Sequence, residues 1–271
     1  MTHYARVRLA DETMHYARLE ARRGNAFDTA CLLARAPWLG VEEIGQHVML
    51  AQTRFDVPVE PSKIIGVGRN YREHAAELNN PVPERPLLFF KPPSSLLAHG
   101  GMLDLPPESQ RVDHEAELVV VIGRRGRRIA AERALEYVFG YSVACDVTAR
   151  DLQRLDGQWA RAKGFDGFCP LGPCVTTGVD PASLPIELYV GDERRQAGNT
   201  REMLFDVPSV IAAVSSFATL EAGDVILTGT PAGVSALAPG DRVSVAVSGL
   251  EKLVFSVRTE PGGPSASRRV D

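Results

Sequence analysis

Apolar and polar positions alternate through the first 60 residues, which predicts β-strands. Segments 4–9 and 14–19 both alternate, and Asp11-Glu12 lies between them, so we expect a hairpin. Gly24-Asn25 is a second turn signal. Residues 56–61 are rich in proline and have little helical potential, which indicates a boundary there. We therefore predict a small β-rich N-terminal domain over residues 1–60.

The remaining chain mixes short apolar runs with a few helical patterns, and we predict an α+β fold that is predominantly β. The expected strands are 63–68, 87–90, the apolar run 119–122, 141–145 and 225–231, with a closing hairpin of 242–247 and 253–257. The expected helices are 69–78, 131–139 and 208–217, and a polar helical turn is expected at 148–153. Residues 158–164 are expected to form a loop. We assign 61–260 to one larger domain and 261–271 to a frayed tail.

Composition restricts the function classes. The 271 residues are 44% hydrophobic and 24% charged, as in an ordinary soluble protein, and the net charge of -4 favours neither nucleic acid nor an anionic membrane as partner. No apolar run approaches the roughly 20 residues of a membrane span, and the first residues lack a signal peptide, so we expect a cytoplasmic protein. The four cysteines lack metal-ligand spacing, which disfavours zinc, and we expect all four to be structural.

Two glutamates precede the most apolar strand of the chain. Glu115 and Glu117 point to the same side of a strand, because side chains alternate between its faces. Their mutual repulsion calls for a cation, and all-oxygen ligands favour Mg²⁺, Mn²⁺ or Ca²⁺. Asp146, at the end of the strand 141–145, could supply a third carboxylate. The alternative is an exposed strand end with two solvated glutamates paired to nearby arginines.

A second candidate site lies on the helix predicted over residues 69–78. His74 and Glu77 are three residues apart, so they share a helix face and can form a hydrogen bond. A carboxylate that orients an imidazole is the arrangement of a general base. The alternative is a surface His–Glu pair. Lys163, beside Gly164, could project its ammonium into a site or remain exposed to solvent.

Six motifs in this order and spacing resemble those of the fumarylacetoacetate hydrolase superfamily. They cover residues 68–234 and read Gly-x-Asn-Tyr-x-x-His-x-x-Glu, Lys-Pro-Pro-Ser, Asp-x-Glu-x-Glu-Leu, Asp-x-Thr-Ala-Arg-Asp-Leu-Gln, Lys-Gly-Phe-Asp and Thr-Gly-Thr-Pro-x-Gly-Val. The resemblance implies a mixed β-sandwich roll and a homodimer. Residues 1–60 are the weakest part of the match.

The resemblance also implies roles for individual residues. It assigns a divalent cation to Glu115, Glu117 and Asp146, the catalytic dyad to His74 and Glu77 on a segment that closes over substrate, and the active-site lysine to Lys163. Substrate contacts fall on Gln153 and Thr230, and on Arg69 beside the lid. Thr228 to Gly233 offers backbone N–H and hydroxyl donors that could hold a carboxylate.

The implied substrates are small 2-oxo and 2,4-dioxo acids. Chelation of the 2-oxo acid by Mg²⁺ or Mn²⁺ would stabilise an enolate, His74 would activate water, and Lys163 would add positive charge beside the developing oxyanion. We favour hydrolysis of a carbon–carbon bond, because the dyad serves water activation. An oxaloacetate-type decarboxylase, a 2-hydroxy-dienedioate isomerase and a non-catalytic metal-stabilised binding protein remain alternatives. We expect the lid and a loop at 191–203 to recognise the substrate's tail.

Overall fold

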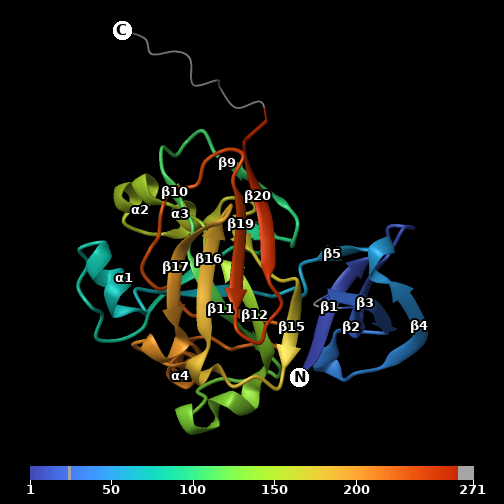
Figure 1. Cartoon of the computed structure of the whole chain (residues 1–271). Helices are drawn as coiled ribbons and strands as arrows, with labels where there is room; N and C mark the ends of the chain where they lie inside the picture. The colour runs from blue at the N-terminus through green and yellow to red at the C-terminus, as the bar shows by residue number, and fades with distance from the viewer. Residues whose placement is uncertain (24–25, 262–271) are drawn as a thin grey trace.

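The structure is a computed structural model that describes residues 1–23 and 26–261. The turn predicted at Gly24-Asn25 and all but the first residue of the predicted tail lie outside these ranges. Most of the regular structure is β, as predicted, and it is arranged as an eleven-stranded sheet, a five-stranded sheet and two strand pairs. Figure 1 shows the N-terminal strands beside a larger body that contains the five-stranded sheet and the remaining strands of the eleven-stranded sheet.

The N-terminal strands are antiparallel neighbours at one end of the large sheet. The predicted hairpin is confirmed, because β1 pairs with β2 from Arg8↔Met14 to Tyr4↔Arg18. β1 also pairs with β15, so this region continues the sheet of the larger body. The strands are β1 (Thr2–Arg8), β2 (Met14–Arg23), β3 (Ala26–Leu33), β4 (Glu43–Met49), β5 (Arg54–Asp56) and β15 (Cys174–Thr177).

The sheet continues from β15 through the centre of the molecule in the order β12-β11-β18-β6-β7. β11 is buried along its whole length: Leu118 and Val120 face one apolar cluster and Val119 and Val121 another. A strand buried on both faces reads as a continuous apolar run, which explains the Val119–Ile122 sequence. The strands are β12 (Val138–Cys145), β11 (Ala116–Ile122), β18 (Val225–Leu227), β6 (Ile64–Gly68) and β7 (Leu87–Lys91).

A second sheet, in the order β17-β16-β19-β20-β9, covers one face of β11 and β12. Its inward side chains, among them Leu188, Val245 and Phe255, join the largest core cluster with Leu118 and Val120. The predicted closing hairpin is confirmed as β19 and β20. The strands are β17 (Glu193–Asn199), β16 (Pro185–Val190), β19 (Arg242–Val247), β20 (Leu253–Thr259) and β9 (Met102–Leu105); two pairs are formed by β10 (Val112–Asp113) with β13 (Thr148–Ala149) and β8 (Leu96–Leu97) with β14 (Cys169–Pro170).

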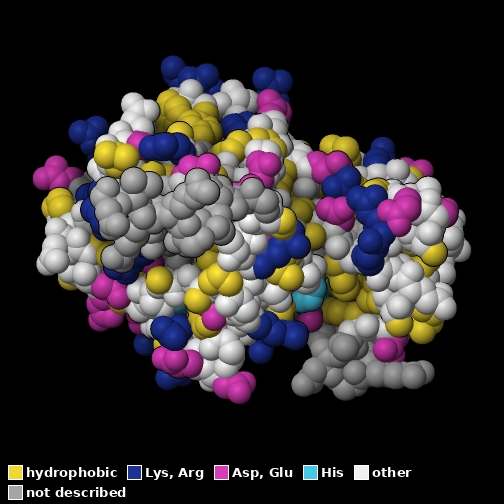
Figure 2. Space-filling view, turned by 90° about the horizontal axis from the view of Figure 1, so that it is seen from above, with side chains coloured by type: hydrophobic (Ala, Val, Ile, Leu, Met, Phe, Trp, Pro, Cys, Tyr) yellow, Lys and Arg dark blue, Asp and Glu magenta, His cyan; other side chains and the backbone are white. Residues whose placement is uncertain are grey.

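The helices are short and lie around the sheets. They are α1 (Arg72–Glu77), α2 (Arg150–Asp156), α3 (Ala160–Gly164) and α4 (Val207–Phe217). Short 3₁₀ helices are η1 (Pro37–Leu39), η2 (Leu50–Gln52), η3 (Pro93–Ser95), η4 (Ala131–Tyr137), η5 (Pro181–Ser183) and η6 (Thr200–Glu202). No helix among the described residues is long and apolar enough to cross a membrane. Figure 2 shows basic and acidic side chains interspersed over the face that it presents.

Three expectations about these segments are wrong. Residues 131–139 are not an α-helix that Gly140 ends; they form η4 and the start of β12. Gly140 lies within the strand, where a Cβ would come 2.6 Å from the backbone oxygen of Thr176. The loop expected at 158–164 contains α3, and the loop expected at 191–203 contains β17 and η6.

Candidate active site

Three carboxylates meet where β11 begins and β12 ends. Ala116 pairs with Cys145, and the backbone N–H of Asp146 donates to the backbone oxygen of Glu115 at 2.8 Å, which brings the two acidic residues together. Glu117 lies two residues further along β11, on the same side as Glu115. Oxygen atoms of all three carboxylates lie within 4.8 Å of one another, and all three residues are buried.

Cations surround two of these carboxylates. The Lys163 ammonium donates to Glu115 Oε2 at 2.9 Å, Asp146 Oδ2 at 2.6 Å and Thr148 Oγ1 at 2.7 Å. Arg150 binds the other oxygen of Glu115, and Lys91 Nζ lies 2.6 Å from Asp146 Oδ1. Burial opposes charge on Glu115, but Arg150 and Lys163 outweigh it and hold the pKa of Glu115 far below its usual range.

The third carboxylate has no such partner. Glu117 Oε2 accepts the backbone N–H of Gly229 at 2.6 Å, and within residues 1–23 and 26–261 no Lys, Arg or His forms an ion pair with it. Burial, Asp146 and Glu115 raise the pKa of Glu117 well above its usual range. Gly229 is required here, since its φ is +94° and a Cβ would lie 2.6 Å from the Cβ of Asn70.

The donor set suits a hard divalent cation. Three buried carboxylates can each offer an oxygen within one small space, and the ionised form of Glu117 has no compensating cation among its described protein neighbours. Carboxylate oxygens are the ligands that Mg²⁺, Mn²⁺ and Ca²⁺ prefer. The residues therefore fit the group that the sequence implies.

His74 and Glu77 adjoin this cluster on α1. His74 Nδ1 lies 3.4 Å from Glu77 Oε2, and His74 Nε2 lies 3.8 Å from Glu115 Oε1. Glu77 is itself held, because its Oε1 accepts the backbone N–H of Gly233 at 3.0 Å. Burial lowers the pKa of His74 more than Glu115 raises it, which favours the neutral imidazole. The arrangement leaves Nε2 available as a base.

A cavity of about 330 Å³ opens onto this site. It is lined by His74, the three carboxylates and the three residues expected to bind substrate, Arg69, Gln153 and Thr230. Lys163 is not among the lining residues: it lies behind the carboxylates, and its three hydrogen bonds all go to protein groups. The structure thus brings together the nine residues singled out in the sequence, with Lys163 in the layer beneath the cavity.

Arg69 and Gln153 each have a defined setting in this cavity. Arg69 has a φ of +55°, unusual for a residue other than glycine, and its guanidinium lies 5.8 Å from the ring centroid of Trp159. Gln153 Oε1 accepts from Arg150 at 3.0 Å, so its side chain is positioned by the same arginine that binds Glu115.

Sequence reasoning misses several supporting residues. The prolines after Lys91 indicate a rigid loop that begins at this residue, but Lys91 ends β7 and is 2% exposed. Arg150 bridges Glu115 and Asp113, and a buried arginine cannot be recognised from spacing alone. Gln196 connects the second sheet to the site, because its Nε2 donates to Thr230 Oγ1 at 2.8 Å and its Oε1 accepts from the N–H of Ala116 at 3.0 Å.

The chain is similar to several known proteins in sequence and in fold. The chain is 43% identical to the mitochondrial oxaloacetate decarboxylase of Dictyostelium discoideum, over 70% of this chain and 90% of that protein. Its fold matches the 2-hydroxyhepta-2,4-diene-1,7-dioate isomerase of Mycobacterium marinum, with a TM-score of 0.89, 35% identity and coverage of 96% and 100% of the two chains.

A third similar protein is the fumarylpyruvate hydrolase of Pseudomonas aeruginosa, solved in complex with Mn²⁺ and pyruvate. The TM-score is 0.70 and the identity 35%, over 76% of this chain and 92% of that one. The family model "Fumarylacetoacetate (FAA) hydrolase C-terminal" matches residues 63–258, which is more than half of the chain. The chain therefore belongs to the fumarylacetoacetate hydrolase family.

Proposed function

We propose that this protein is a divalent-metal-dependent enzyme that hydrolyses a carbon–carbon bond in 2,4-dioxo acids. The observation that carries the proposal is the convergence of Glu115, Glu117 and Asp146 at the base of a cavity whose wall also presents His74. Enzymes on this fold differ in reaction, so the proposal rests on the site and not on the fold.

The three carboxylates would hold Mg²⁺ or Mn²⁺, and Ca²⁺ is also compatible with oxygen ligands. When bound, the cation would act as a Lewis acid toward the carboxylate and 2-oxo oxygens of the substrate. The fumarylpyruvate hydrolase of Pseudomonas aeruginosa was solved with Mn²⁺ and pyruvate, which supports both the cation and the substrate class.

His74 would act as the general base. Its Nδ1 faces Glu77, which favours the tautomer with the proton on Nδ1 and leaves Nε2 to take a proton from water. The hydroxide adds to the 4-carbonyl, and the bond between carbons 3 and 4 breaks. Its electron pair passes to the 2-oxo fragment, which takes up a proton and leaves as pyruvate, while the acyl fragment leaves as a carboxylic acid.

Lys163 would supply fixed positive charge beneath the reacting carbons. Burial opposes its charge, yet Asp146 and Glu115 raise the pKa of Lys163 above its usual value, so it remains an ammonium. Thr230 and Gln153 line the cavity and are already held by hydrogen bonds to Gln196 and Arg150. Their positions support a role in orienting the substrate.

Two arginines of the cavity wall suggest which chemical group the substrate carries at the end remote from the 2-oxo acid. Arg69 and Arg154 line the cavity, and neither has a carboxylate partner among the described residues. Unpaired guanidinium groups at a cavity wall suit a second carboxylate. We therefore propose that the preferred substrates are dicarboxylic, which is consistent with the substrates named for the Dictyostelium and Mycobacterium proteins.

Decarboxylation is a second candidate, favoured by the 43% identity to an oxaloacetate decarboxylase, and double-bond isomerisation is a third, favoured by the Mycobacterium marinum structure. Each would use the same three carboxylates and would act on a substrate that contains a 2-oxo acid or its enol form. A homodimeric state and a cytoplasmic location remain predictions from the sequence.

Product analysis tests the proposal. The wild type and His74→Ala would be assayed with Mg²⁺ on acetylpyruvate, fumarylpyruvate, oxaloacetate and a 2-hydroxy-dienedioate. Pyruvate and a carboxylic acid from either acylpyruvate, lost in the variant, would support hydrolysis. Turnover of oxaloacetate that survives in the variant would favour decarboxylation, and a spectral change of the dienedioate without fragmentation would favour isomerisation. No turnover of any of these compounds would contradict an enzymatic role.

A further inference from the structure

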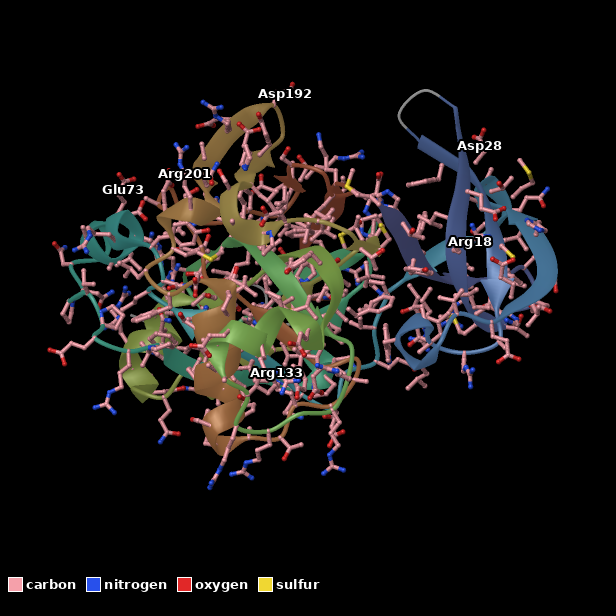
Figure 3. All side chains as sticks on the ribbon, turned by 90° about the horizontal axis from the view of Figure 1, so that it is seen from below. Arg18, Asp28, Glu73, Arg133, Asp192 and Arg201 are labelled. Atoms are coloured by element: carbon pink, nitrogen blue, oxygen red, sulfur yellow. The ribbon has the colours of Figure 1, made fainter. Side chains whose placement is uncertain are left out.

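A second group of possible metal ligands lies in the N-terminal strands, outside the residues matched by the family model. It consists of Glu20 on β2, Cys31 on β3 and His47 on β4. Cys31 and His47 are direct cross-strand partners, and Arg18, two residues before Glu20, is paired with Cys31 on the other side. The three side chains therefore share one face of the sheet. Figure 3 labels Arg18 in this part of the molecule.

The donor atoms of the group are close together. His47 Nδ1 lies 2.9 Å from Glu20 Oε2, and one sulfur, one imidazole nitrogen and one carboxylate oxygen all lie within 4.8 Å of one another. Cys31 is fully buried, whereas the His47 side chain is 58% exposed. The Cys31 end of the group is therefore buried, and the His47 end is open to solvent.

We propose that Glu20, Cys31 and His47 form a binding site for Zn²⁺ that is separate from the carboxylate site. Sulfur and imidazole ligands select Zn²⁺ over Mg²⁺, whereas the oxygen-only cluster has the opposite preference. Three protein ligands with the fourth position left to water are a common zinc arrangement. Binding releases the proton of the Cys31 thiol to solvent, so the coordinating sulfur is a thiolate, and a neutral His47 coordinates through Nδ1 with its proton on Nε2.

The neighbouring charges position Glu20, whereas Glu43 interacts with the Cys31 thiol and opposes its ionisation until a cation is bound. Arg18 binds Glu20 through Oε1 at 2.9 Å and Glu43 at 2.5 Å, so Glu20 keeps Oε2 directed at His47. The arginine holds the carboxylate in place and partly offsets its charge. A metal at this position would join three consecutive strands and fix β4, the outermost strand of the eleven-stranded sheet.

Cobalt absorption provides the test, because Co²⁺ takes the place of Zn²⁺ and a thiolate ligand gives a near-ultraviolet charge-transfer band that oxygen ligands do not. The full chain would be saturated with Mg²⁺ and titrated with Co²⁺. We expect the band in the wild type and in Glu117→Gln, which weakens the carboxylate site, and its disappearance on addition of Zn²⁺. Cys31→Ser and His47→Ala should abolish it, while His15→Ala, a histidine of β2 outside the group, should retain it.

Absence of the band in the wild type, or its persistence in His47→Ala, would overturn the proposal. Because Cys31 is fully buried, Cys31→Ser can fail to fold; His47 is exposed, so His47→Ala decides the question. As an independent measurement, Zn²⁺ should raise the Tm of the Mg²⁺-saturated wild type and leave that of His47→Ala unchanged. An equal shift in both proteins would contradict the assignment.

Discussion

The Lys91 ammonium lies 2.6 Å from Asp146 Oδ1, and both residues are buried at the back of the carboxylate cluster. Lys91 also donates to the backbone oxygen of Phe168 at 3.0 Å. Lys91 is the last residue of β7, whereas Asp146 directly follows β12, so this ion pair connects strands that are not neighbours in the sheet. Lys91 is thus a support for the proposed metal ligand and does not line the cavity.

Lys91→Met should lower the free energy of unfolding by about 1–3 kcal/mol in the presence of EDTA, since Oδ1 of the buried Asp146 loses its cation while Lys163 still binds Oδ2. Urea denaturation measures the change. The double variant Lys91→Met/Asp146→Asn should recover part of the loss. A loss below about 1 kcal/mol in the single variant would contradict the role assigned to Lys91.

In the metal-free protein, replacement of Glu117 and of Glu115 by glutamine should change the free energy of unfolding in opposite directions. Glu117→Gln removes a carboxyl group whose ionised form is opposed by burial and by its acidic neighbours, and it preserves an acceptor for the Gly229 N–H, so it should raise the free energy of unfolding by on the order of 1 kcal/mol. Glu115→Gln deprives Arg150 and Lys163 of a partner and should lower it by about 3 kcal/mol.

Denaturation in EDTA measures both variants, and Mn²⁺ titration should show weakened binding in each. Because the two changes are chemically identical, each variant is the control for the other. Equal destabilisation by both variants would contradict the assignment of Glu117 as a carboxylate without a cationic partner.

His99 should make stability depend on pH. Burial, and then Arg242, lower its pKa, and its Nδ1 accepts the backbone N–H of Val254 at 3.2 Å. The unfolded chain, with a pKa of about 6.5 for this histidine, binds a proton before the folded chain does, so stability falls as pH drops below about 6.5. His99→Asn should flatten the decline in Tm between about pH 7 and pH 5. An unchanged slope would contradict this assignment.

Arg154→Gln should reduce kcat/KM for fumarylpyruvate, which has a second carboxylate, by about tenfold or more, in keeping with loss of a charge-assisted hydrogen bond. Turnover of acetylpyruvate, which has none, should be nearly unchanged. Arg161→Gln is the matched control, because Arg161 lies on the neighbouring helix and already pairs with Asp156. An equal loss on both substrates would exclude a specific role for Arg154.

The parts of the fold and site that depend on local pattern can be predicted from the sequence. Alternation identifies the first hairpin, and the apolar run identifies β11, because burial on both faces requires it. The site residues are found through motifs whose order matches a family. Residues that act through the tertiary fold are missed: Lys91 and Gln196 reach the site from other strands, and Cys31 meets His47 only through cross-strand pairing. The spacing of residues along the chain does not predict contacts that form only when distant strands pair or pack together.

The most direct test of the central claim is calorimetric titration with oxalate, a mimic of the pyruvate enolate, with and without Mn²⁺. We predict that the wild type binds oxalate only when Mn²⁺ is present and that Glu117→Gln does not bind it under either condition. Oxalate binding that is equally strong in EDTA, or that Glu117→Gln retains at full strength, would contradict a metal site built from Glu115, Glu117 and Asp146.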